Sequence, residues 1–326
     1  MERLLRRSNT NKARYYAWKI SENIDQIEYA CNGCEGVIHP SLTTRRVGSL
    51  MIREINYIPH IAKALKAGHA TIMVGSGFSR YADPCNGMDC DFLSWDQRTD
   101  CFYEKLYGNE GDSGKNYIDP FLLTDQLEQA IGRTALEEIL RQLIADQQYA
   151  PTELFQKLME LPWRDVFTTN YDTLLEKATS HIPDREYDVI TSQDDLIRNE
   201  KISRLIKLCG SFTSKRPYVI TGEDYSTYPE LHAPMLNTVR QAFLENTFLM
   251  IGYSVNDPDF LKWTEWIMDF FSKSSPRKLY MIAESHVAEP QSTILFKKNI
   301  IVVELEKIWK EDGPKRRLEK FLDALV

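Results

Sequence analysis

The sequence lacks the features of several large protein classes. It has no run of about 18 apolar residues, so no membrane-spanning helix is expected. The N-terminal stretch MERLLRRSNTNKARYY has no apolar core of the kind that secretory signals carry. A net charge of −7 argues against a general nucleic-acid-binding surface. We therefore expect a cytoplasmic protein that contacts neither a membrane nor nucleic acid directly.

Cysteine is scarce and irregularly spaced, which excludes a disulfide scaffold and fits a reducing cytosol. The six residues are Cys31, Cys34, Cys85, Cys90, Cys101 and Cys209. Cys31 and Cys34 form a CxxC pair and Cys85 and Cys90 a looser one, so four thiolates are available for a tetrahedral zinc site. Because the pairs lie about 50 residues apart, on opposite sides of the first predicted strand, we interpret them as surface or core thiols and expect no metal.

Short apolar segments alternate along the chain with amphipathic helical ones. Six of these segments are typical of buried strands: ATIMV, DVF, RLIKL, TFLMI, KLYMI and IIVVE. The alternation predicts an α/β fold with a doubly wound, mostly parallel sheet. Residues 51–326 form this main domain, in which residues 92–160 are a helical insertion that caps the sheet. Residues 1–50 are a helical appendage, either a solvated helix or a docking arm.

Four of the predicted strands end in loops of small and polar residues, and ligands of such sheets bind where strands end. The first loop is Gly75–Arg80, with the sequence GSGFSR. Its two glycines allow the backbone to approach a phosphate closely, and Arg80 adds positive charge. The loop lacks the third glycine of the dehydrogenase fingerprint and the Gly-Lys-Ser/Thr of a Walker loop.

The other three loops are Thr168–Asp172 (TTNYD), Lys207–Ser211 (KLCGS) and Gly252–Asp257 (GYSVND). Each also has a purely structural interpretation. The first fits a helix N-cap, the second a glycine turn with a buried cysteine, and the third a capped helix. A cap needs only one such residue, whereas TTNYD supplies a cluster, so the local patterns leave both interpretations open.

Taken in order, GSGFS, TTNYD, KLCGS and GYSVND resemble the loops of the sirtuin-like family of NAD-consuming domains. The resemblance is greater to the branch found in bacterial antiphage defence than to the protein deacylases. That pattern reads Gly-x-Gly-x-Ser, Thr-Thr-Asn-Tyr-Asp, Lys-Leu-His-Gly-Ser and Gly-Tyr-Ser-x-x-Asp. It spans roughly residues 55–325. Any one loop is a weak signal, and the ordered set is specific.

The resemblance implies a Rossmann-like fold and a set of site residues. Asn170 would hold the nicotinamide ribose or a water beside it, Asp172 would support that site by hydrogen bonding, and Asp257 would cap the next helix. NAD would be the substrate, cleaved to nicotinamide and ADP-ribose or a cyclised form. The cofactor-binding residues would be Gly75, Ser76, Gly77, Ser79, Arg80, Thr168, Gly210, Ser211, Gly252 and Ser254.

One departure from the family pattern concerns the catalytic base. Cys209 stands where the family has a histidine, and a buried thiol with a pKa near or above about 8.5 accepts a proton poorly at neutral pH. Three explanations stay open. The chain is a weakened or inactive NAD- or ADP-ribose-binding subunit, or it cleaves NAD without a strong base, or Cys209 is an engineered substitution that silences a toxic enzyme.

The leading hypothesis is an NAD glycohydrolase effector of antiphage defence, with the inactive binding subunit as the alternative. Such an effector must be held off until infection, so we expect a homo-oligomer or a complex with a separate sensor or regulator protein. Protein deacylation is disfavoured because no cysteine follows Cys209 to form the zinc module of deacylases, and ADP-ribosyl transfer is a weaker alternative. A dehydrogenase fits least, because TTNYD has no place in hydride transfer.

Overall fold

The computed structural model describes residues 43–47, 50–54, 56–85, 92–108, 119–180, 182–183, 185–200, 203–214, 217–269 and 278–326. The chain divides into two compact units, Met1–Asn56 and Tyr57–Val326. In the first unit, strand β1 (Thr43–Val47) pairs antiparallel with β2 (Leu50–Glu54). The predicted helix over residues 1–50 is therefore wrong for Thr43–Val47, where β-branched residues favour a strand. For residues 1–42, which lie outside the described residues, the helix stays a prediction.

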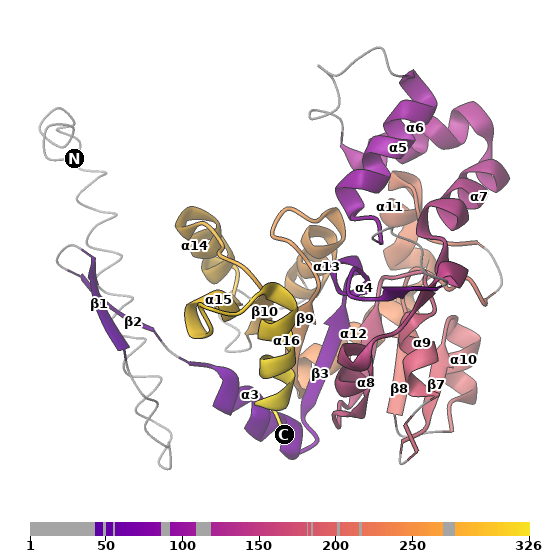
Figure 1. Ribbon diagram of the computed structural model, residues 1–326. Helices are drawn as coiled ribbons and strands as arrows, with labels where there is room; N and C mark the ends of the chain where they lie inside the picture. Colours follow the sequence, from indigo (N-terminus) through magenta and orange to yellow (C-terminus); the bar gives the residue numbers. More distant parts are fainter. Residues whose placement is uncertain are drawn as a thin grey trace, which may run out of the picture. The chain divides into compact units, whose positions relative to one another are not determined.

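In the second unit the described residues form a seven-stranded sheet in the order β11-β10-β9-β3-β6-β8-β7, in which every pair is parallel (Figure 1). This confirms the predicted α/β class and parallel sheet. The strands are β3 (Ala70–Val74), β6 (Asp165–Thr168), β7 (Tyr187–Ile190), β8 (Ser203–Lys207), β9 (Thr247–Ile251), β10 (Leu279–Ala283) and β11 (Ile300–Glu304). All residues of β3 and β10 are buried, as expected for strands covered on both faces.

Helices and short strands connect the members of the sheet. The helices outside the cap are α3 (Ile58–Lys66), α4 (Ser76–Ser79), α8 (Glu153–Glu160), α9 (Leu174–Thr179), α10 (Gln193–Arg198), α12 (Ala233–Glu245), α13 (Pro258–Asp269), α14 (Glu289–Lys297), α15 (Leu305–Ile308) and α16 (Pro314–Asp323). The 3-10 turn Asp146–Gln148 precedes β5 (Tyr149–Ala150), which pairs with β4 (Asp83–Pro84). No helix among the described residues is long and apolar enough to cross a membrane.

The cap consists of α5 (Trp95–Tyr107), α6 (Pro120–Ile131) and α7 (Arg133–Ile144), joined by α11 (Gly222–Leu231) from later in the chain. Figure 1 shows these helices gathered at the end of the sheet where β3 terminates. Gly132 adopts a φ of 83° and separates α6 from α7. The predicted cap over residues 92–160 also includes α8, but α8 packs against α9 and α16, beside the sheet.

The strand order brings the four predicted loops together. They follow β9, β3, β6 and β8, which are consecutive neighbours in the sheet. The chain passes from β3 to β6 on one side and from β9 to β10 on the other, so the order reverses between β3 and β9. Ligands of doubly wound sheets bind in the crevice at this switch point.

Candidate active site

The loops after β3 and β9 pack directly on each other. The N–H groups of Gly75 and Gly77 donate to the carbonyl oxygens of Ile251 (2.8 Å) and Gly252 (2.9 Å). A Cβ on Gly75 or on Gly77 would come within 2.7 Å of the Gly252 oxygen. These glycines therefore allow two loops of the protein to approach each other. Their expected contact with the NAD diphosphate stays a prediction.

A hydrogen-bond network links the first loop to TTNYD. The Asn170 side-chain amide donates to the Gly75 carbonyl (3.1 Å) and to Ser79 Oγ (3.0 Å), and Ser79 Oγ donates to Asp172 Oδ2 (2.8 Å). The Thr168 hydroxyl donates to the Val74 carbonyl and accepts the Asn170 backbone N–H. Ser79, expected to bind diphosphate, thus connects the two predicted catalytic residues.

The side-chain oxygen of Asn170, Oδ1, is a hydrogen-bond acceptor at the pocket. Among the described residues, its buried Oδ1 has no hydrogen-bond partner. A buried polar atom without a partner costs about 1–3 kcal/mol, so such atoms mark places where a ligand or water completes the structure. Asn170 lines a pocket, and a hydroxyl group there is the kind of donor that this oxygen lacks.

Asp172 is buried beside a buried lysine. Burial raises the pKa of its carboxyl, while the nearby Lys207 ammonium and the Ser79 hydroxyl act to lower it. Asp172 Oδ1 also accepts the Leu174 N–H at the start of α9. Lys207, in turn, donates to the Asp172 carbonyl and to Glu176 Oε1. Both carboxyl oxygens of Asp172 therefore have protein donors, which fits the supporting role predicted for it.

Cys209 is buried under the cap. Its Sγ lies 3.6 Å from the hydroxyl of Tyr225, a residue of α11. Burial raises the pKa of the thiol well above its usual value, and the nearby Asp259 raises it further. Cys209 is therefore a neutral thiol at physiological pH and does not supply the proton acceptor that a histidine would.

Two aspartates begin α13. Asp257 Oδ1 accepts the Asp259 N–H (2.9 Å), which agrees with its predicted role as a helix cap. The Asp259 carboxyl accepts a hydrogen bond from the Tyr225 hydroxyl, and the nearby Thr169 hydroxyl acts to lower the pKa of this carboxyl. Burial raises the pKa of both carboxyls, and Arg98 acts to lower them.

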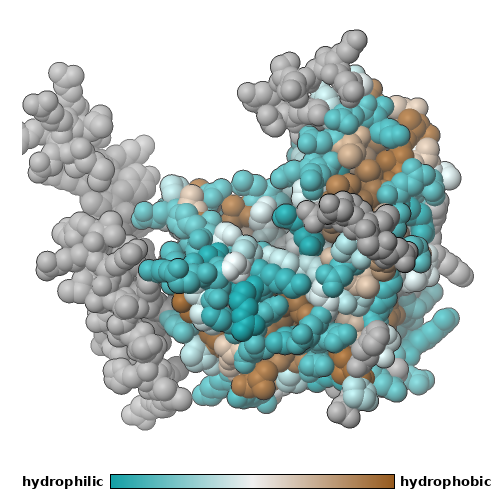
Figure 2. All heavy atoms as spheres, in the orientation of Figure 1, coloured by the Kyte–Doolittle hydropathy of each residue, from teal (hydrophilic) through white to brown (hydrophobic). Residues whose placement is uncertain are grey.

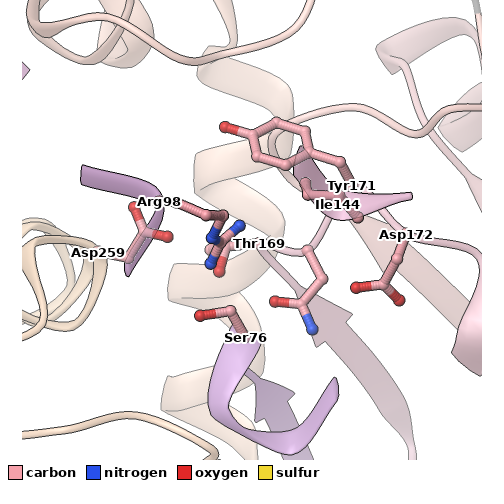
Figure 3. Close-up of a pocket in the computed structure, with 8 residues that line it drawn as sticks. Ser76, Arg98, Ile144, Thr169, Tyr171, Asp172 and Asp259 are labelled. Carbon is pink, nitrogen blue, oxygen red and sulfur yellow. The ribbon is translucent and has the colours of Figure 1, made fainter. Parts of the chain in front are cut away.

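The pocket at the centre of these groups is small, with a volume of about 10 Å³, about the space that one water needs. Figure 3 shows Arg98, from α5, beside Thr169 and facing Asp259. The lining residues are Ser76, Arg98, Ile144, Thr169, Asn170, Tyr171, Asp172 and Asp259. Of the predicted site residues, Ser76, Asn170 and Asp172 line this pocket. Arg98 and Asp259 were not predicted, because they come from helices outside the four loops.

Comparison with known proteins finds similarity to one domain family and to two bacterial enzymes. A model of the SIR2-like domain family matches residues 164–303. The chain is similar to the NAD(+) hydrolase ThsA of Acinetobacter baumannii, with 27% identity over 214 residues, 62% of this chain and 40% of that protein. It is also similar to the NAD(+) hydrolase ThsA of Cytobacillus dafuensis, with 27% identity over 62% of this chain and 38% of that protein. The chain spans about two-fifths of the length of these curated relatives.

Among solved structures, the chain is similar to a Sir2 homolog–NAD complex, with a TM-score of 0.42 and 12% identity over 82% of this chain and 95% of the other. The matched SIR2-like segment begins just before β6 and ends within β11. It therefore includes TTNYD, KLCGS and GYSVND, whereas GSGFS and α5–α7 precede it.

The remaining predicted site residues lie outside the pocket lining. Gly210 has a φ of 93° and packs against Tyr218, and Ser211 Oγ donates to Glu176. Arg80 and Ser254 are exposed. Of the cysteines considered for zinc, Cys31, Cys34 and Cys90 lie outside the described residues. The described part of the chain contains no cluster of metal-binding side chains.

Proposed function

We propose that this chain is an NAD glycohydrolase of bacterial antiphage defence that acts in the cytosol and cleaves NAD to nicotinamide and ADP-ribose. The observation that carries the proposal is Asn170. Its side chain is fixed by Gly75 and Ser79 at the switch point of the sheet, and its Oδ1 faces a pocket without a protein partner among the described residues. The relatives' naming as NAD(+) hydrolases supports the same activity.

The proposed reaction breaks the bond between the ribose C1′ and the nicotinamide nitrogen. The electron pair stays on the ring nitrogen, so nicotinamide leaves neutral and the ribose becomes oxocarbenium-like. Asn170 Oδ1 would accept a hydrogen bond from a ribose hydroxyl and orient the sugar. In their ionised forms the surrounding carboxyls would provide negative potential where positive charge develops, and fixed groups in a water-poor site stabilise such charge efficiently.

The size of the pocket implies that binding requires a rearrangement. A volume of about 10 Å³ admits a water but no nicotinamide, and Arg98 from α5 lies where the pocket meets the cap. We propose that the cap moves to admit NAD, and that a separate sensor or regulator, or assembly into a homo-oligomer, favours the moved position. This would hold a hydrolase of an essential metabolite inactive until it is needed.

The alternative function is a binding subunit that holds NAD or ADP-ribose without turnover. The observation that favours it is Cys209, whose buried, neutral thiol replaces the family's histidine. The two functions differ in one measurable quantity, the release of nicotinamide.

The test follows nicotinamide release by the purified protein, alone and with its operon partner. The panel consists of the present sequence, Asn170→Ala, Cys209→His and the matched control Asn237→Ala, which removes an exposed asparagine of α12. We expect the present sequence and the control to release nicotinamide and Asn170→Ala to release about a hundredfold less. Release only by Cys209→His, or binding without release in every assembly, would instead establish the binding subunit.

A further inference from the structure

The proposed hydrolysis needs a group that accepts the proton of the attacking water, and Cys209 does not supply one. Of the pocket-lining residues in the described part of the chain, two carry carboxyl groups, Asp172 and Asp259. Asp172 receives Ser79 and the Leu174 N–H on its two oxygens. Asp259 is the carboxyl that faces the pocket from the opposite side, next to Arg98 (Figure 3).

The position of Asp259 relates directly to the family's histidine position. The Tyr225 hydroxyl donates to Asp259 Oδ1 and also lies 3.6 Å from Cys209 Sγ. A single phenol group of the cap thus lies between the residue that replaces the histidine and the carboxyl of α13. The Asp259 carboxyl is therefore separated from Cys209 by one side chain, that of Tyr225, and it lies at the pocket.

Asp259 has the accessibility that a base needs. Asp259 lines the pocket, whereas Cys209 is buried and is not among the lining residues. A water in the pocket can therefore contact the carboxyl of Asp259. Burial raises the pKa of this carboxyl, which makes its ionised form a stronger base, while Arg98 and the hydroxyl donors act to keep it ionised.

The local sequence explains how the carboxyl is aimed. Pro258 occupies the first position of α13, and Asp257 accepts the Asp259 N–H. Asp259 is then held in the first turn of the helix, with its side chain directed at Tyr225. Because Asp257 caps the N-terminus of α13, helix capping does not explain why a second aspartate stands at position 259.

We propose that Asp259 is the general base of the hydrolysis, an inference that rests on the proposed function. As the C1′–nitrogen bond breaks and its electron pair goes to nicotinamide, the oxygen of a pocket water forms a bond to C1′. The Asp259 carboxylate takes the proton that this water loses. The products are neutral nicotinamide, ADP-ribose and a protonated Asp259, which returns its proton to solvent.

The first test replaces the carboxyl by an amide of the same shape. Asp259→Asn is expected to lower kcat for nicotinamide release about a hundredfold or more and to leave ADP-ribose binding unchanged. The matched control is Asp269→Asn, which changes an exposed aspartate at the end of the same helix and should keep full activity.

Two further measurements separate a base from a merely structural residue. Formate should partly restore turnover to Asp259→Ala, because a small carboxylate can occupy the vacated space. The decline of activity at acidic pH, which reports protonation of the base, should disappear in Asp259→Asn. The titratable groups that face Asp259 from the surrounding elements are Arg98, Tyr171, Cys209, Tyr225, Tyr253 and Asp257.

The outcomes distinguish this proposal from the function on which it rests. If Asn170→Ala is inactive but Asp259→Asn turns over NAD like the unmodified chain, the hydrolase stands and Asp259 is not its base. Loss of activity together with loss of ADP-ribose binding, without rescue by formate, also overturns the role of Asp259. If the unmodified chain binds NAD but releases no nicotinamide in any assembly, both proposals fail.

Discussion

Ser79 and Asp172 form the chain of hydrogen bonds that holds the side chain of Asn170 in place. Ser79 accepts from Asn170 and donates to Asp172, so the ionised form of Asp172 would polarise the hydroxyl that orients the amide. A hydrogen bond to a charged group is worth about 1.5–3 kcal/mol. Much of the precision of the Asn170 side chain therefore depends on a residue that does not itself need to contact substrate.

Asp172→Asn is expected to reduce kcat for nicotinamide release by about tenfold to a hundredfold, because the charge-assisted bond to Ser79 is lost. Ser79→Ala removes the same bond from the other side. Since the residues share one interaction, the double variant should be little worse than either single one. A double-mutant cycle on kcat measures this, and effects that simply add would contradict the network.

At this scale the sequence predicted the residues near the strand ends but not those brought in by helices. Asn170 and Asp172 were predicted from the order of the four loops, and the structure places both at the pocket. Arg98 lies in a helix whose local pattern carries no signal of a site. Asp259 follows Pro258 at a helix start, where an acidic residue is common for electrostatic reasons alone.

Among the elements, the contact between the loops after β3 and β9 depends on backbone conformation. Gly252 has a φ of 74°, and a Cβ there would meet the Phe78 nitrogen at 2.6 Å and the Gly75 oxygen at 2.8 Å. Gly68 offers a matched comparison. It has a φ of 72°, but nothing lies within 4 Å of the position that its Cβ would occupy.

Gly68→Ala and Gly252→Ala should therefore differ in their effects. Both place a side chain in a left-handed conformation, at a cost of about 1 kcal/mol. Gly252→Ala additionally forces the two loops apart, so we expect a further loss of about 1–3 kcal/mol and a strong loss of nicotinamide release. Thermal melting and turnover measure the two effects. Equal melting temperatures and equal activities would show that the loop contact contributes nothing.

In α6 and α7, the spacing of apolar residues does not predict which of them are buried. Helical spacing predicts one apolar stripe made of Leu123, Leu127, Ile131, Leu136 and Ile139. Gly132 instead breaks the helix, and Ile131 is exposed. The edge strand β7, with the sequence YDVI, was not predicted. It is short and includes partly exposed residues, so it lacks the continuous apolar run that marks the central strands.

On the scale of the whole molecule, the domain buries carboxyl groups whose protonation is linked to folding. Burial raises the pKa of Asp172, Asp257, Asp259 and Glu284. The folded state consequently binds more protons than the unfolded state above about pH 4, the ordinary carboxyl pKa. Stability therefore falls as pH rises from there through the raised pKa values. His232 acts in the opposite direction, because burial lowers its pKa.

A comparison with Asp257→Asn isolates the carboxyl effect, because asparagine keeps the helix cap and removes the charge. Relative to this variant, the unmodified protein should lose melting temperature as the pH is raised from about 4 toward neutrality. Melting curves of both proteins across this range measure the difference. A difference that stays constant with pH would show that Asp257 titrates as an ordinary carboxyl.

The sequence predicted the fold class but not the order of the strands in the sheet. Alternating strands and helices predicted a parallel sheet, and all six predicted strands are present in it. That their four loops follow the consecutive strands β9, β3, β6 and β8 is a property of topology, which pairs segments up to about 180 residues apart. Figure 2 shows hydrophilic and apolar surface interspersed, and this surface does not mark the site.

Because Cys209 is buried beneath Tyr225, its reaction with a thiol reagent can report movement of α11. A thiol reacts with maleimide as the thiolate, and both its burial and its raised pKa suppress that species while α11 is seated. Alkylation of Cys209, followed by peptide mass spectrometry, would therefore proceed only as often as α11 separates from the end of β8. The alkylation rate of Cys209, compared with and without an activator, would therefore measure how often α11 moves. The measurement also works in a variant that no longer cleaves NAD.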